Sequence, residues 1–145
     1  MPVILLDVNI LIYAHREDAP SHQKYQRWLE DLVNGDNAFA VADLVFSGFL
    51  RIVTHPKVFN PGSPIEDALL FIDELRSRPN FVSLAPGMRH WDIFTRLCRE
   101  TQAKGNLIPD AFFAALAIET GSEWITTDRD YARFSSLKWR HPFNA

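Results

Sequence analysis

Three aspartates stand out in this sequence because of the segments beside them. Asp7 and Asp128 each follow a short run that is typical of a buried strand, and Asp110 opens an alanine-rich stretch. Each also has a purely structural interpretation, because aspartate commonly caps a helix or a turn. If the fold brings the ends of these segments together, three carboxylates from distant points of the chain converge on one site.

Converging carboxylates would favour a particular kind of ligand. They repel one another, which raises their pKa values unless a cation lies among them. The chain has five histidines, without a partner at metal-site spacing, and a single cysteine, so its oxygen donors favour Mg²⁺ or Mn²⁺ over zinc. A divalent ion held in this way can activate water and stabilise charge on a phosphoryl oxygen.

The elements that must position these aspartates alternate along the chain. We expect strands over residues 3–6, 39–42, 81–84 and 124–127, with a short edge strand over 137–140. Helices are expected from about Ser21 to Gly35, over 44–53, from Pro64 to Arg78, from about Arg89 to Lys104, and over 110–120. No separate helix is assigned to residues 8–14. Alternation of this kind predicts a parallel sheet with helices on both faces, and the carboxyl ends of its strands are where ligands bind.

Local signals predict how two of these helices begin. Asp43 is placed to cap the helix over 44–53, with membership of the acidic cluster as the alternative. Ser63 and Glu66 have the spacing of a capping box. Gly48, inside a helix where glycine is unfavourable, is interpreted as a close approach of another backbone.

Composition limits the classes of protein that fit. With 145 residues, the chain is expected to form a single domain over 1–145. A net charge of −3 provides no general basic field for nucleic acid, so any such contact must be local. The single cysteine, the lack of a basic leader and the lack of a membrane-length apolar run predict a cytoplasmic protein without membrane contact.

Three motifs together resemble a PIN domain. They are Asp7-Val8-Asn9 after an apolar strand, Pro109-Asp110-Ala111 opening an alanine-rich helix, and Thr126-Thr127-Asp128-Arg129-Asp130-Tyr131 leading into Ala132-Arg133-Phe134. Their order and the chain length resemble the VapC-type toxins of toxin–antitoxin pairs. The resemblance implies a three-layer α/β/α sandwich with a central four- to five-stranded parallel sheet. It also implies a metal-dependent endoribonuclease that acts on RNA, forms a homodimer and is inhibited by a VapB-type antitoxin.

The same resemblance implies roles for individual residues. Asp7, Asp110 and Asp128 correspond to the catalytic acids and the ligands of Mg²⁺ or Mn²⁺, with Asp7 and Asp110 the strongest ligand candidates. Asn9 and Thr127 would orient these carboxylates.

Asp130 would add negative charge at the edge of the site. The resemblance implies that this site hydrolyses RNA phosphodiester bonds. Candidate contacts to RNA phosphates are the loop cations Arg16, Lys57, Arg129 and Arg133.

The sequence departs from the family at one position. PIN domains commonly carry a glutamate just ahead of a Phe-Leu-Arg-like run, and here Gly48 precedes Phe49-Leu50-Arg51. Asp43 lies five residues earlier, about 140° round an ideal helix, so it does not replace that acid on the same face. A three-carboxylate site is therefore expected.

Three other classes of protein are weighed against this one. Because that glutamate is missing, a catalytically inactive PIN-fold binding module remains an alternative. A haloacid-dehalogenase-like phosphatase also begins with a strand that ends in aspartate, but it needs a second aspartate where this chain has Asn9. A receiver domain needs an acid after the third strand, and residues 85–86 are Ala-Pro.

Overall fold

The computed structural model describes residues 1–144, in which short strands alternate with helices. The strands are β1 (Ile4–Leu6), β2 (Phe39–Ala40), β3 (Glu123–Ile125) and β4 (Trp139–Arg140). The helices are α1 (Val8–His15), α2 (His22–Val33), α3 (Asp43–Val53), α4 (Ile65–Arg76), α5 (His90–Thr101) and α6 (Leu107–Thr120), followed by the 3-10 helix η1 (Arg129–Arg133).

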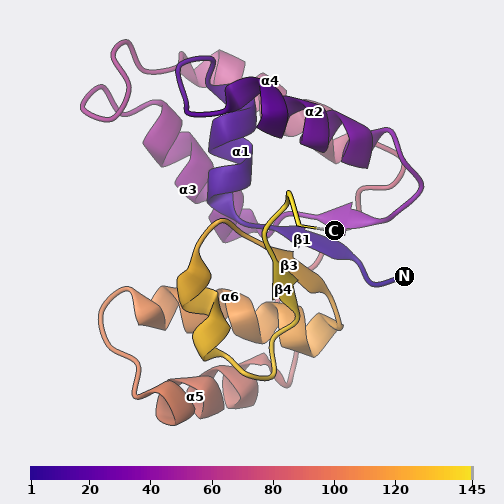
Figure 1. Ribbon diagram of the computed structural model, residues 1–145, viewed down its shortest axis with the longest axis vertical. Coiled ribbons are helices and arrows are strands. Elements are labelled where there is room, and N and C mark those ends of the chain that lie inside the picture. Colours follow the sequence, from indigo (N-terminus) through magenta and orange to yellow (C-terminus); the bar gives the residue numbers. More distant parts are fainter. Residues whose placement is uncertain (145) are drawn as a thin grey trace.

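The strands form one parallel sheet in the order β2-β1-β3-β4, with β4 at an edge as expected. Helices α1 to α4 lie on one side of the sheet and α5 and α6 on the other (Figure 1). The predicted three-layer α/β/α sandwich with a parallel sheet is therefore confirmed.

The strand expected over residues 81–84 is not formed. Phe81 makes a single parallel bridge to Phe39, and the amide of Val82 donates to the carbonyl of Phe39 at 2.9 Å. Since β2 is only two residues long, it offers too little backbone for a longer ladder. The segment stays beside the sheet as extended chain.

Helix α1 is not among the helices that the sequence predicts. Its apolar residues surround the axis, and Ile10, Leu11, Ile12 and Ala14 are all buried. A helix buried on every side has no polar stripe, so the 3.6-residue period that marks an amphipathic helix is absent. It lies in contact with both α2 and α3.

Helix α6 begins at Leu107, three residues earlier than expected. Pro109 is tolerated there because the first-turn N–H groups have no partner within the helix. Four alanines on α6 are fully buried, and Phe113 stacks on Trp124 of β3 with ring centroids 5.6 Å apart. Small side chains allow α6 to lie close to the sheet, which places Asp110 near its edge.

The predicted caps at Asp43 and Ser63 are both wrong. Asp43 is the first residue of α3 rather than its cap, and its side chain is 97% exposed, 3.9 Å from Arg76. Pro64 occupies the cap position of α4, and no side chain caps this helix end. The Ser63 hydroxyl instead bonds the end of α1, which excludes the predicted capping box.

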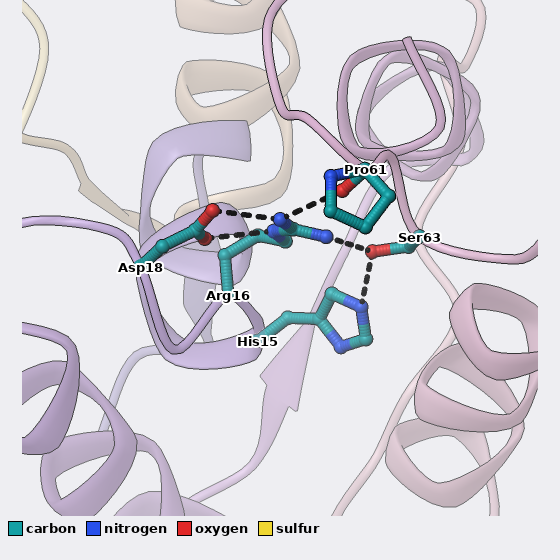
Figure 2. Close-up of polar contacts among 5 residues, drawn as sticks. All are labelled: His15, Arg16, Asp18, Pro61 and Ser63. Carbon is teal, nitrogen blue, oxygen red and sulfur yellow. Dashed lines mark hydrogen bonds and ion pairs between the residues drawn. The ribbon is translucent and has the colours of Figure 1, made fainter. Parts of the chain in front are cut away.

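Figure 2 shows the contacts that engage Ser63. Its hydroxyl lies 3.2 Å from Nε2 of His15 and accepts a hydrogen bond from Arg16 at 3.0 Å. Arg16 also forms a bidentate ion pair with Asp18 and donates to the carbonyl of Pro61 at 3.0 Å. These contacts fasten the end of α1 to the α3–α4 loop, so Arg16 is occupied structurally and is not a candidate for phosphate.

Within residues 1–144, no helix combines the length and the apolar character that a membrane span requires.

Candidate active site

Asp7 is held by two hydrogen bonds at the carboxyl end of β1. One carboxylate oxygen accepts from the backbone N–H of Val8 at 2.7 Å, and the other accepts from the Thr126 hydroxyl at 2.6 Å. The first bond caps α1, so the structural and the chemical interpretations of Asp7 hold together. Burial raises the pKa of Asp7, the two hydrogen bonds oppose that rise, and the charge of Asp128 adds to it.

Thr126 contacts Asp7, and this contact was not predicted from the sequence. It is fully buried, donates to Asp7, and accepts a hydrogen bond from the backbone N–H of Asp128 at 3.0 Å. In the parallel register Leu6 pairs with Ile125, so the next residues on the two strands are neighbours. A threonine directly after a buried strand was the signal available in the sequence, and its role follows only once the pairing of β3 with β1 is known.

Asp110 lies in the first turn of α6, half-buried, and accepts a hydrogen bond from the hydroxyl of Tyr131 at 3.2 Å. Burial is the largest cause that raises the pKa of Asp110 from 3.8 to about 6. The hydrogen bond from Tyr131 opposes the rise, whereas the charges of Asp128, Asp7 and Asp130 add to it. The structure therefore brings the three predicted aspartates within electrostatic reach of one another.

Tyr131 has no role in the sequence-based prediction beyond its place in a motif. Only 2% of it is exposed, and its ring packs on Trp124 with centroids 5.3 Å apart. Burial, followed by the charges of Asp7 and Asp110, raises the pKa of its hydroxyl, which therefore stays protonated as a donor to Asp110.

The remaining predicted residues lie at the edge of this group. One carboxylate oxygen of Asp128 accepts from the backbone N–H of Asp130 at 2.9 Å and caps η1. Asp130 itself is exposed, and its charge acts on Asp110. Asn9 and Thr127 contact each other at 3.5 Å, so the bond to a carboxylate that was expected of Thr127 is made by Thr126 instead.

The oxygen donors of the three aspartates are the kind that a hard divalent cation prefers, but their side chains are not arranged as a ready-made metal site. Among residues 1–144, no group of three His, Cys, Asp or Glu side chains is placed to hold a metal ion. Mg²⁺ keeps several waters and needs only one or two carboxylates from the protein. Asp7 and Asp110 are the two whose ionised forms are disfavoured by burial and by their neighbours, and a cation would remove that cost.

The close backbone contact that was expected at Gly48 is not found within residues 1–144. A Cβ built on it would meet only the Cγ2 of Val8, at 3.9 Å, among the described residues. Val8 follows Asp7 directly, so α3 presents this position to the amino end of α1 beside the site. A Cβ would meet no more than ordinary van der Waals contact here, so the contacts of the described residues do not require a glycine at this position.

Comparisons with known proteins agree with this architecture. A family model described as PIN domain matches residues 4–137. Ribonuclease VapC43 of Mycobacterium tuberculosis is 42% identical over 142 residues, which cover 98% of this chain and 97% of that protein. Ribonuclease VapC25 of the same organism is 39% identical over 140 residues, covering 97% and 99%.

Solved structures share the fold at lower identity. A chain of VapBC2 from Rickettsia felis, bound to a DNA fragment from their promoter, has a TM-score of 0.68 at 21% identity and covers 96% of this chain and 98% of that one. A chain of VapBC-1 from nontypeable Haemophilus influenzae has a TM-score of 0.70 at 15% identity, covering 98% and 99%.

Proposed function

This chain belongs to the PIN-domain family, and from that premise we propose that it is a metal-dependent endoribonuclease of the VapC type, the toxin of a toxin–antitoxin pair. The alternative of a haloacid-dehalogenase-like phosphatase is overturned, because the PIN model spans residues 4–137. Likeness over nearly the whole length to proteins named VapC ribonucleases supports the activity. The observation that carries the proposal is the grouping of Asp7, Asp110 and Asp128, in which burial and the charge of Asp128 raise the pKa values of Asp7 and Asp110.

In this proposal Asp7 and Asp110 hold Mg²⁺ or Mn²⁺, with Asp128 beside them. The bound ion supplies an activated water and stabilises charge on a phosphoryl oxygen. Thr126 and the amide of Val8 fix the carboxylate of Asp7, so it needs no reorganisation when substrate arrives.

Tyr131 fixes one oxygen of Asp110 in the same way, and within residues 1–144 no hydrogen bond engages the other oxygen, which would face a ligand. One of the site carboxylates takes the proton of the attacking water, and the 3′ oxygen of the RNA leaves from the opposite side of phosphorus.

The partners follow from charge. A chain with a net charge of −3 and an acidic site suits an antitoxin that brings a basic segment, and we propose a VapB-type antitoxin as the inhibitor. We propose a homodimer, as the family resemblance implies, and a cytoplasmic setting, which the single cysteine suits. RNA would be bound through local cations, because the protein has no general basic field.

The test is cleavage of total bacterial RNA by the purified, antitoxin-free protein with Mg²⁺, with Mn²⁺ and with chelator. Asp110→Asn should abolish metal-dependent cleavage, because it removes a ligand while keeping the shape of the side chain. The matched control is Asp43→Asn, which removes the same charge from an exposed position on α3 and should cleave like the wild type. A folded protein that cleaves with neither metal would contradict the nuclease and favour the inactive binding module, to which the missing acid at Gly48 also points.

A further inference from the structure

A cavity of about 410 Å³ opens directly beside Asp110. It lies between the α5–α6 connection and η1, and η1 packs against α6 (Figure 1). Its wall includes Asp110 and Asp130 on the site side, together with Gln102, Lys104, Asn106 and Arg133. We call it the α5–η1 cavity. Its volume falls within the range of about 300–1,000 Å³ in which proteins bind small organic groups.

The cations of the α5–η1 cavity are available to a ligand. Lys104 and Arg133 are both exposed, and in the part of the chain that the structure describes neither forms a salt bridge. A polyanion that reaches Asp110 must bring its neighbouring phosphates close to several carboxylates. Two cations in the adjoining wall offset that repulsion, which a chain of net negative charge cannot do through its overall field.

The amides of the cavity add a second kind of contact. The residues that end α5 and precede α6, Gln102 and Asn106, make no side-chain hydrogen bond within residues 1–144. Gln102 adopts the left-handed conformation, with φ 49° and ψ 51°, where glycine is strongly preferred because a Cβ is crowded. A glutamine side chain at a position that favours glycine points to a use for that side chain. Amide groups donate and accept side by side, which matches the edge of a nucleobase.

We propose that the α5–η1 cavity binds the nucleotide next to the cleaved bond of single-stranded RNA, with Lys104 and Arg133 on its phosphate and Gln102 and Asn106 on its base. The proposal rests on the proposed ribonuclease function and adds to it the subsite that selects the substrate. Bases of single-stranded RNA are free to present their edges in this way, whereas those of a duplex are paired.

The first experiment measures binding of a fluorescent ten-nucleotide RNA by anisotropy in chelator, where cleavage is off. Lys104→Ala/Arg133→Ala should weaken binding, and the slope of log K against log salt should fall in magnitude by about 0.7, since one neutralised phosphate of a single strand contributes about that amount. The control is Lys24→Ala/Arg27→Ala, which removes one lysine and one arginine from the exposed face of α2 in the opposite layer. It should keep the wild-type slope.

The second experiment tests the amides with four homopolymeric RNAs. Gln102→Gly should raise the thermal midpoint by roughly 2–4 °C, because it relieves the left-handed residue, and should reduce the difference in affinity between the best and the worst homopolymer. Asn106→Ala should reduce it without that gain in stability. Stabilisation by Gln102→Gly with unchanged base preference would overturn the base-reading role.

The outcomes separate the subsite from the nuclease. If Lys104→Ala/Arg133→Ala keeps the wild-type salt slope while the wild type cleaves RNA with Mn²⁺, the subsite is wrong and the nuclease stands. If that variant instead binds RNA normally and loses a co-expressed antitoxin, the cavity belongs to a protein partner and the proposal is overturned. If the wild type neither binds nor cleaves RNA, both fall.

Discussion

Replacing Asp110 by asparagine should stabilise the metal-free protein at neutral pH, although it removes a residue of the proposed metal site. The pKa of Asp110 is about 6 in the fold against an ordinary value of 3.8, with burial as the largest cause. Because the folded-state value is the higher one, the ionised carboxylate is less stable in the fold than in the unfolded chain. Asparagine carries no charge and keeps an oxygen that accepts the hydrogen bond from Tyr131.

The size of the gain follows from the two pKa values. At ~1.4 kcal/mol for each tenfold change in the protonation equilibrium, a rise from 3.8 to about 6 corresponds to at most ~3 kcal/mol. We reduce this to about 1–2 kcal/mol because Asp110 is only half-buried and water screens its charge. Loss of the favourable interaction with the amino end of α6 removes up to ~0.5 kcal/mol. The thermal midpoint should then rise by roughly 2–5 °C.

The assay is thermal unfolding in chelator across a pH series. The gain should be complete above a pH of about 6, decrease as the pH falls toward 3.8, and vanish below it, where Asp110 is protonated in both states. Saturating Mg²⁺ should reverse the order, since the ion stabilises only the protein that binds it. Asp43→Asn, at an exposed position, should stay within about 0.5 kcal/mol of the wild type. A lower midpoint for Asp110→Asn near neutral pH, or a gain that persists in acid, would refute the reasoning.

Three further substitutions test the contacts around the site. Thr126→Val leaves a buried oxygen of Asp7 without its donor and should lower the free energy of unfolding by about 2–3 kcal/mol in urea titrations. Thr126→Ser keeps the hydroxyl donor and should retain most of the wild-type stability. Tyr131→Phe removes the hydrogen bond that lowers the pKa of Asp110, so the pH midpoint of Mn²⁺ binding should rise; an unchanged midpoint would exclude this effect. Gly48→Glu should bind Mn²⁺ more tightly than Gly48→Gln, while both gain up to ~1 kcal/mol of stability from removing a helical glycine. Equal Mn²⁺ affinities for these two variants would place residue 48 outside the metal site.

The sheet and the edge on which the aspartates lie could be predicted from the sequence. A buried parallel strand is a short apolar run, and an acid directly after it, as at Asp7, marks its carboxyl end. Asp110 could be placed because an alanine-rich helix that is apolar on all sides must lie in the core. These signals are local in the chain, so composition and spacing are enough to find them.

The features that were missed depend on contacts between distant segments. Ser63 has the spacing of a capping box, but its hydroxyl lies between His15 and Arg16, which are 48 and 47 residues away. Thr126 acquires its role only when β3 pairs with β1 and brings it beside Asp7. No periodicity within one segment reports such pairings, because they are decided by the packing of the whole sheet.

Asp7 caps α1 with the same carboxylate that we propose as a metal ligand, and this affects how an inactive variant should be made. Asp7→Ala removes a proposed metal ligand and also the cap of α1, so the protein loses about 1 kcal/mol or more of helix stability. In a growing cell, a loss of this size lowers the amount of folded protein several-fold through proteolysis. Cells that carry Asp7→Ala could then survive because they contain little folded protein, and not only because that protein is inactive. Asp7→Asn keeps the cap of α1, because its side-chain oxygen still accepts the bond from Val8, although its amide group then faces the Thr126 hydroxyl. The amount of folded Asp7→Asn protein in the cell should therefore be measured beside the survival assay.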